Sequence, residues 1–454
     1  MTLGFWTGPV PAEEGVNLDS LRLGARYLRW TPVGGGSATA APTPQATATP
    51  TPQDAATDVR EPVPLPQGMT LAEWEAMAER NSPTLAQAAA RVQAMRGEWL
   101  QSGLYPNPRA GYKASEIGDD GQAGQQGAFF GQEFVTAGKL GRARDAADQA
   151  VQQAQWAWEA QRGRVISDVR RAFYDVLVAQ RSVELTDQLV RIGQEGVRAA
   201  EQLLRAKEVS RVDVLQARIE ADSARILAEK ARNRHLAAWR NLAVVAGVAD
   251  MQPAPLAGDL QDGLAQLTWE EGVHRVLADS PVLAEARTGV ARAEAVLGRQ
   301  CAERVPNVDM QAGVLYDNAT RDTIAEVQVG VPLPLFNRNQ GNIRKAQAEL
   351  TAARAEVHRA ELELQQRLAA TFEQYQNARC QVEKYAAEIL PNAQTSLDLV
   401  TAGYRQGEFN YVTLLMSQRT FFQVNLAYVD AIRDLRSAAV AIEGNLLGDS
   451  LQQR

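Results

Sequence analysis

The sequence predicts a mainly α-helical protein with a small β-sheet contribution, built from two copies of one pattern. Three observations predict this fold class. Equivalent residues recur at a fixed spacing, proline is missing from very long stretches, and short segments of alternating apolar residues precede those stretches. Each copy is therefore expected to be a strand hairpin followed by a long coiled-coil helical hairpin.

The repeat runs from Thr70 onward: Leu71-Ala-Glu-Trp begins the first copy and Leu267-Thr-Trp-Glu the second. Each copy then reaches a Ser-Pro pair that is typical of a helix start, at Ser82-Pro83 and Ser280-Pro281. A Pro-Asn pair follows, and from there the copies run in step at a spacing of 200 residues. The matched positions are Pro106-Asn107 with Pro306-Asn307, Gly141 with Gly341, Arg205 with Arg405, Glu208 with Glu408, Val212 with Val412, and Leu215 with Leu415. A repeat of this length indicates a duplicated domain half rather than a solenoid.

This repeat divides the chain into segments. Residues 1–33 show no decisive period, and residues 34–66 form a linker rich in Thr, Pro and Ala. The two repeats are expected at 67–250 and 267–447, with a linker at 251–266 and a tail at 448–454. Strands are expected at about 109–117 and 127–135 in the first repeat, and at about 307–316 and 324–332 in the second.

Long helices follow from the distribution of proline. None lies between Pro108 and Pro253, and a helix over about 140–204 would extend about 100 Å at 1.5 Å per residue. Its heptad seam is formed mostly by small or β-branched residues: Val165, Val169, Ala172, Val176, Ala179, Val183, Thr186, Val190, Gly193, Val197, Ala200 and Leu204. Adding 200 places a looser seam in the second copy, at Ala369, Phe372, Ala386, Leu390, Ala393, Leu397, Val400 and Tyr404.

The chain is expected to reverse near 207–211 and again near 406–411. After the first reversal, apolar residues at helical spacing predict a returning helix: Val212, Leu215, Ile219 and Ile226. Each copy thus contains a helical hairpin, and rods of this length need neighbouring helices to cover them.

Alternation of apolar and polar residues predicts the strands. The clearest series is Val308, Met310, Ala312, Val314 and Tyr316, followed after the turn DNATRD by Val327, Val329 and Val331. A weaker series in the first copy is Ala110, Tyr112, Ala114, Ala128, Phe130 and Phe134. Phe130, Phe134 and Tyr316 fit either the aromatic girdle of a membrane barrel or the core of a soluble hairpin.

Strands of about nine residues can cross a bilayer when tilted, but membrane sheets must close so that no edge faces lipid. Four strands per chain cannot close alone. Three chains would supply twelve strands, so closure predicts a homotrimer with a 12-strand barrel in outer-membrane lipid, continued by an α-helical tunnel.

Composition excludes several classes of function. The formal net charge is -7 with both signs interspersed, which gives no basic face for a nucleic acid. No run of about 18 apolar residues occurs, so any membrane crossing must use strands. The opening MTLGFWTGPVPAEEG has no secretory signal, which counts against export unless the natural start differs or another export route operates.

The sequence offers no catalytic or metal-binding constellation. His235, His274 and His358 are scattered, and Cys301 and Cys380 form no CxxC pair. The segment GKLGR lacks the spacing of a phosphate-binding loop, and no nucleophile-elbow motif is present. We therefore expect no enzymatic activity, no cofactor and no dedicated metal site.

Residues 70–447 resemble the outer-membrane efflux protein (TolC) family. The resemblance rests on the duplicated halves, on Gly138-Lys139 before the first long helix, and on the turns LLRAKEVSRVDVLQAR and YRQGEFNYVTLLMSQR. VPLPLFNRNQGNI, residues 331–343, and LYPNP, residues 104–108, resemble the cobalt-zinc-cadmium branch of heavy-metal efflux proteins. The resemblance implies a passive outer-membrane conduit that extends into the periplasm and exports small toxic solutes, heavy-metal cations in this branch.

Family resemblance also implies the partners: a homotrimer, a periplasmic adaptor protein, and an inner-membrane proton-driven pump that supplies the energy. The two helix turns would form the inner mouth and face the adaptor. The residues expected there are Lys207, Glu208, Val209, Ser210, Asp213, Gly407, Glu408, Phe409, Asn410 and Thr413.

Two alternatives stay open from sequence. Asp213 resembles an acidic position at the mouth of relatives, yet an acid in the first turn of a helix is also favoured by the helix dipole. A ring of carboxylates is at most partly present, because Thr413 stands at the equivalent position. The whole chain is either a transport conduit or a soluble coiled-coil scaffold, and the scaffold leaves the amphipathic hairpins unexplained.

Overall fold

The computed structural model describes residues 68–118, 123–260 and 266–452. These residues belong to the compact unit Leu65–Arg454. The expected segments 1–33 and 34–66 lie outside the described residues, as do 261–265 of the expected linker and 453–454 of the tail.

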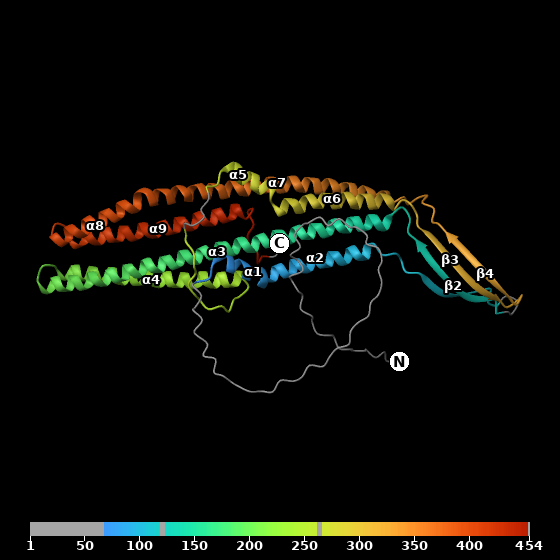
Figure 1. The fold of residues 1–454 in the computed structure, drawn as a ribbon, viewed down its shortest axis with the longest axis horizontal. Helices are drawn as coiled ribbons and strands as arrows, with labels where there is room; N and C mark the ends of the chain where they lie inside the picture. The colour runs from blue at the N-terminus through green and yellow to red at the C-terminus, as the bar shows by residue number, and fades with distance from the viewer. Residues whose placement is uncertain (1–67, 119–122, 261–265, 453–454) are drawn as a thin grey trace, which may run out of the picture. The chain divides into compact units, whose positions relative to one another are not determined.

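The two halves of this unit have the same order of elements (Figure 1). The first contains α1 (Leu71–Asn81), α2 (Pro83–Ser102), β1 (Arg109–Ser115), β2 (Gln125–Phe134), α3 (Lys139–Arg205) and α4 (Arg211–Val245). The second contains α5 (Trp269–Ala278), α6 (Pro281–Ala302), β3 (Val308–Asp317), β4 (Asp322–Gly330), α7 (Gln340–Lys384), a π-helical turn (Tyr385–Ile389), α8 (Leu390–Gln406) and α9 (Tyr411–Glu443). The predicted duplication into strand hairpins and long helical hairpins is confirmed.

The strands form one antiparallel sheet in the order β1-β2-β3-β4, so the hairpins of the two halves pair with each other through β2 and β3. The sheet lies at one end of the helices, and the α3–α4 and α8–α9 turns lie at the other (Figure 1). None of the described helices is both long and apolar enough to cross a membrane.

Each half has its own hydrophobic core against a long helix. In the first half, Trp74 of α1 and Trp239 of α4 are almost fully buried, with their rings edge to face and 5.5 Å between centroids. In the second half, Leu368 and Tyr375 of α7 pack with Ile442 of α9. Aromatic and aliphatic burial therefore fixes the short helices on the middle of the long ones.

The predicted seam of the second long helix is wrong in its first part. Leu364 and Leu368 are buried, whereas the predicted Ala369 is exposed. The buried positions therefore follow Val165 and Val169 of α3 by 199 residues instead of 200.

The π-helical turn restores the spacing of 200. It holds an extra residue relative to an α-helical turn, which shifts all following side chains around the helix by one position. Pro391 is the second residue after this turn, and proline lacks an N–H and clashes with the carbonyl four residues earlier, so an ordinary α-helical turn is disfavoured there. Beyond the turn, Leu390 and Leu397 are half-buried, as the spacing of 200 predicts.

Helix α4 packs on α3 mainly through alanine side chains. The larger aliphatic residues from which the helix was predicted do not form this contact. Its buried residues include Val214, Ala217, Ala221, Ala224, Ala228 and Ala231. In contrast, Val212 and Ile219 are 67% and 66% exposed. A Cβ atom at Gly193 of α3 would lie 3.1 Å from the Cα of Ala221, so the backbones approach closely. Small side chains permit this approach and leave the large aliphatic residues of α4 outside the α3–α4 contact.

An Ala221→Leu substitution is expected to destabilise the protein by about 1–3 kcal/mol, because a larger side chain overpacks the α3–α4 contact. Urea unfolding followed by circular dichroism measures this change. Ile219→Ala, on the exposed side of α4, is the matched control and should change stability by less than about 0.5 kcal/mol. Equal losses in both variants would contradict the alanine seam.

Candidate functional site

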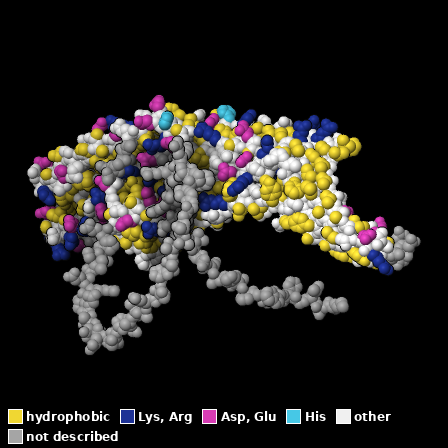
Figure 2. Space-filling model, turned by 45° about the vertical axis from the view of Figure 1, so that its right-hand side comes forward, with side chains coloured by type: hydrophobic (Ala, Val, Ile, Leu, Met, Phe, Trp, Pro, Cys, Tyr) yellow, Lys and Arg dark blue, Asp and Glu magenta, His cyan; other side chains and the backbone are white. Residues whose placement is uncertain are grey.

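The sheet has one apolar and one polar face. The pairing aligns Tyr112, Ala128, Val314 and Ala325 across the strands, and residues two apart share a face. The apolar face carries exposed Val, Met, Phe and Tyr side chains, with Val327 71% exposed. Figure 2 shows hydrophobic side chains gathered over this part of the molecule. An exposed apolar surface of this kind is typical of contact with lipid or with another protein.

The polar face lies on the inner side of a curved sheet. Lys113 of β1 forms an ion pair with Glu326 of β4, although β2 and β3 lie between these strands. The pair can form only when the sheet curls toward its polar face. Gly127 and Gly313, which carry no side chain, lie on this face beside Lys113 and Glu326, and Leu315 is buried on the same face. The apolar residues are therefore on the convex side.

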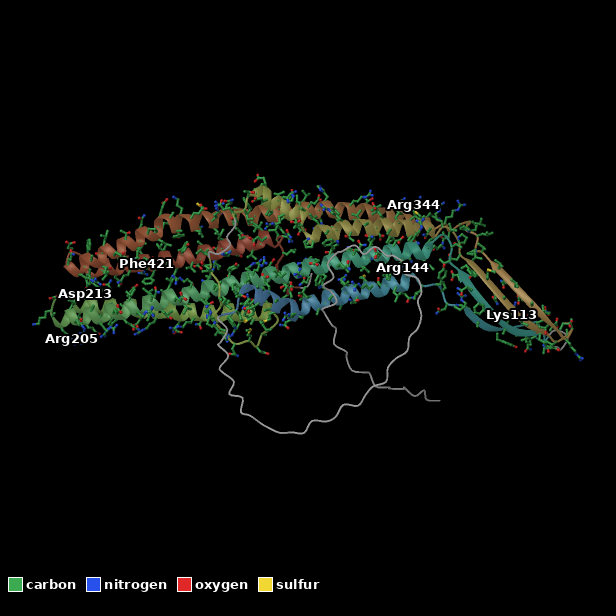
Figure 3. All side chains as sticks on the ribbon, viewed as in Figure 1. Lys113, Arg144, Arg205, Asp213, Arg344 and Phe421 are labelled. Atoms are coloured by element: carbon green, nitrogen blue, oxygen red, sulfur yellow. The ribbon has the colours of Figure 1, made fainter. Side chains whose placement is uncertain are left out.

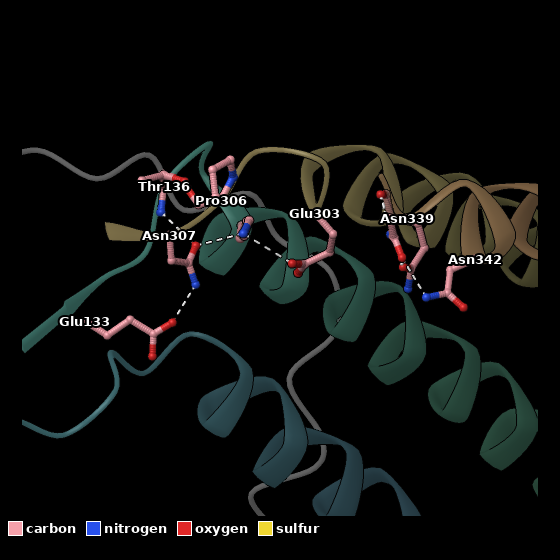
Figure 4. Close-up of polar contacts among 9 residues, drawn as sticks. Glu133, Thr136, Glu303, Pro306, Asn307, Asn339 and Asn342 are labelled. Atoms are coloured by element: carbon pink, nitrogen blue, oxygen red, sulfur yellow. Dashed lines mark hydrogen bonds and ion pairs between the residues drawn. The ribbon is translucent and has the colours of Figure 1, made fainter. Parts of the chain in front are cut away.

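A cluster that we call the junction clamp joins the two halves where the strands meet the helices (Figure 4). Lys139, the buried first residue of α3, donates to Oδ1 of Asn307 at 2.8 Å and lies 3.3 Å from Oε2 of Glu303. The Thr136 N–H donates to the same Asn307 oxygen, and the Thr136 hydroxyl donates to the Pro306 carbonyl at 2.6 Å. The clamp thus ties the start of α3 to the segment that leads into β3.

The two helix turns at the opposite end close in the same way. Lys207 and Gly407 both adopt positive φ, 63° and 79°, just after their helices end. The next N–H in each turn bonds back into the helix, from Glu208 to the Leu203 carbonyl and from Glu408 to the Gly403 carbonyl. These bonds satisfy helix-end carbonyls, so the turns are well-defined structures 200 residues apart.

The structure brings the expected tip residues to these two turns. Lys207, Glu208, Ser210, Gly407, Glu408, Phe409 and Asn410 are exposed, and Val209, Asp213 and Thr413 are half-buried. Figure 3 shows Asp213 at the end of the helices remote from Lys113 of the sheet.

Asp213 caps the start of α4. Its carboxylate accepts from the hydroxyl and the backbone N–H of Ser210, both at 2.8 Å, and these bonds lower its pKa. Asn410 caps α9 instead by accepting from the Thr413 N–H at 2.9 Å. Burial first and the Asp213 charge second raise the pKa of Tyr404 on α8. The contacts that the structure shows for the Asp213 carboxylate are those of helix capping.

An apolar groove beside the turns was not predicted. It has a volume of about 530 Å³ between α4 and α9. The apolar side chains that line this tip groove are Val212, Leu215, Ile219, Val412, Leu415 and Met416. The sequence contained a signal, since Val212 with Val412 and Leu215 with Leu415 recur at the repeat spacing, but the recurrence does not say that the side chains are exposed.

Within the described ranges, no three His, Cys, Asp or Glu side chains converge on a point that could hold a metal ion. His235 is partly buried, which lowers its pKa, and Cys301 and Cys380 are free and exposed.

Duplicated hairpins that combine one amphipathic, curved sheet with long paired helices define a channel-forming class of membrane protein. The chain belongs to the outer membrane efflux protein family, whose sequence profile matches residues 74–248 and 272–448. It is 27% identical over 375 residues to the cobalt-zinc-cadmium resistance protein CzcC of Cupriavidus metallidurans, covering 83% of this chain and 89% of that protein.

Solved structures share the fold. The channel-forming protein CusC superposes with a TM-score of 0.70 at 18% identity, over 83% of this chain and 92% of that one. The outer membrane protein VceC of Vibrio cholerae superposes with a TM-score of 0.68 at 18% identity, over 83% and 96% of the two chains. The protein is therefore an efflux channel subunit of the outer membrane.

Proposed function

We propose that this chain forms, as a homotrimer, the passive outer-membrane conduit of a tripartite pump that exports heavy-metal cations. The observation that carries the proposal is the curved sheet with an exposed apolar convex face and a polar concave face. Such a sheet suits lipid outside and water inside once its edges are paired. The cation class rests on the similarity to CzcC, whose name states cobalt-zinc-cadmium resistance.

Energy and partners come from outside the chain in this proposal. An inner-membrane proton-driven pump supplies the energy, and a periplasmic adaptor contacts the tip residues around 207–213 and 407–413. The tip groove, apolar and open, supports an adaptor contact there. No catalysis is assigned, because a cation passes through the conduit without bond chemistry. The proposal also divides the chain into functional repeats at 67–250 and 267–447, which each supply one strand hairpin and one helical hairpin.

Native mass in mild detergent, combined with cation resistance, tests the proposal. Expression in a host that lacks its own conduit of this type, together with the cognate adaptor and pump, is expected to restore growth in zinc, cobalt or cadmium. The purified protein should have the mass of three chains. A single chain that stays in solution without detergent would contradict the conduit.

Placing a charge on the convex face tests its contact with lipid. Val327→Arg is expected to cost about 2–4 kcal/mol per chain, because Val327 lies near the middle of β4 on the convex face and would face the bilayer midplane. Gln328→Arg, one residue away on the concave face, is the matched control and should be tolerated. Folding into vesicles, followed by urea titration, measures both variants. Equal tolerance of the two arginines would argue against a lipid-facing convex surface.

A further inference from the structure

We propose that residues 331–336 of one copy pack on Leu104 and Tyr105 of a neighbouring copy, and that this apolar contact joins neighbouring copies in the trimer. The inference rests on the proposed function, because it identifies a contact through which the proposed homotrimer would close. Its occupant is a second copy of this chain.

The junction clamp supplies the template. Inside one chain, the connection from β2 to α3 covers the Pro306-Asn307 pair, which is half-buried as a result. The repeat makes Pro106-Asn107 the equivalent pair, yet Asn107 is exposed. The equivalent of the covering segment is the connection from β4 to α7, and residues 331–338 are all exposed. Each chain therefore presents one exposed asparagine, Asn107, where its equivalent Asn307 is covered, and one exposed segment that covers nothing in its own chain.

These two surfaces lie on opposite edges of the same unit. Helix α2 runs along one edge and α7 along the other, with α3 and α6 between them (Figure 1). In the described sheet, β1 is the edge strand next to α2 and β4 is the edge strand next to α7. A neighbouring copy that paired its β4 with β1 would bring its residues 331–336 to the end of α2. A head-to-tail contact of this kind closes into a ring when the rotation allows.

The chemistry of the two surfaces matches. Leu104 and Tyr105 are 52% and 68% exposed, and Leu335 and Phe336 are 65% and 90% exposed. A phenyl ring that is 90% exposed on a folded surface is unfavourable in water, and burying it against Tyr105 and Leu104 of the neighbouring copy removes that cost. Two prolines, Pro332 and Pro334, restrict the segment, so little conformational entropy is lost on binding.

The contact between copies differs in kind from the clamp inside one chain. The clamp contains a buried lysine and Glu303, whereas the position 200 residues before Glu303 is Gly103 and the covering segment 331–336 has no charge. If the start of α3 in one copy covered the end of α2 in another, Lys139 would lie against Leu104 without a carboxylate partner. An unpaired buried charge is strongly unfavourable. The polar contact therefore forms only within a chain and the apolar one only between chains.

Disulfide trapping in the full chain tests this contact. Tyr105→Cys and Phe336→Cys are combined in a background with Cys301→Ser and Cys380→Ser, assembled in detergent, and oxidised. Non-reducing gels should show bands of two and three chains that disappear on reduction. Either cysteine alone should give no three-chain band. Thr136→Cys with Pro306→Cys, at the clamp, is the intrachain control. Its free thiols should disappear on oxidation while the protein still migrates at the mass of one chain.

The outcomes separate the contact from the proposed function. A native mass of three chains without the disulfide-linked bands of two and three chains would overturn the contact, while the proposed conduit would remain supported. A native mass of one chain would instead contradict the trimer itself. Phe336→Trp adds a second measurement: its fluorescence should be unaffected by brominated lipid, and strong quenching would overturn the inference by placing residue 336 in the bilayer.

Discussion

An Asn307→Leu variant is expected to lose roughly 1–3 kcal/mol of unfolding free energy, because the Lys139 ammonium loses one of its two acceptors and keeps Glu303. The Asn307 oxygen accepts from the buried ammonium of Lys139 at 2.8 Å and from the Thr136 N–H at 3.3 Å. A buried donor that loses its acceptor costs about 1–3 kcal/mol, and more when it is charged. Thermal unfolding of the detergent-solubilised protein measures the loss. The strands should also separate from α3 at a lower temperature than in the unchanged protein, because the clamp joins these elements.

A second substitution shows whether the buried charge causes the loss. Lys139→Met, added to Asn307→Leu, removes the ammonium that has lost one of its two acceptors and should recover part of the stability, because Glu303, which loses its partner, is partly exposed to water. Asn107→Leu is the matched control in the first repeat: the residue is exposed in one chain, so its own hydrogen bonds contribute little. If the double variant is no more stable than Asn307→Leu, the loss arises from packing and not from the charge.

Substitutions that introduce acidic residues into the tip groove are expected to abolish export without affecting the fold. Val212→Asp with Met416→Asp places two carboxylates on opposite walls of the groove. Covering two aliphatic side chains contributes about 1.5–3 kcal/mol each, so their loss should weaken adaptor binding by about 100-fold or more. Both side chains are highly exposed in the free chain, so unfolding should change little. Adaptor affinity and cation resistance are the two readouts.

Leu399→Asp is the matched control for the groove. Leu399 is 66% exposed on α8, like Met416 on α9, but it does not line the groove. This variant should keep both adaptor affinity and resistance. An adaptor that binds the groove double variant with unchanged affinity would show that the docking surface lies elsewhere on the chain.

Several features of the candidate site were predictable because their signals are local. The turn residues around Lys207 and Gly407 follow from where two long helices must reverse. The alternation from Val308 to Tyr316 gave the strand, and it also gave the face that carries the apolar side chains. The junction clamp gave no such signal. Lys139 and Asn307 are far apart in the sequence, and their contact depends on how the two halves pack.

The sequence by itself determined the duplication, because equivalent residues recur at a spacing that can be read from the chain directly. It also determined the long helices and the amphipathic strands, because proline and side-chain alternation act over a few residues of backbone. Only the tertiary structure decided which face of each helix is buried. Alanine, not isoleucine, faces α3 from α4, since close approach of two backbones rewards the smaller side chain. The shift to 199 residues in α7, corrected by the π-helical turn, likewise appears only when the buried side chains of both halves are compared in space.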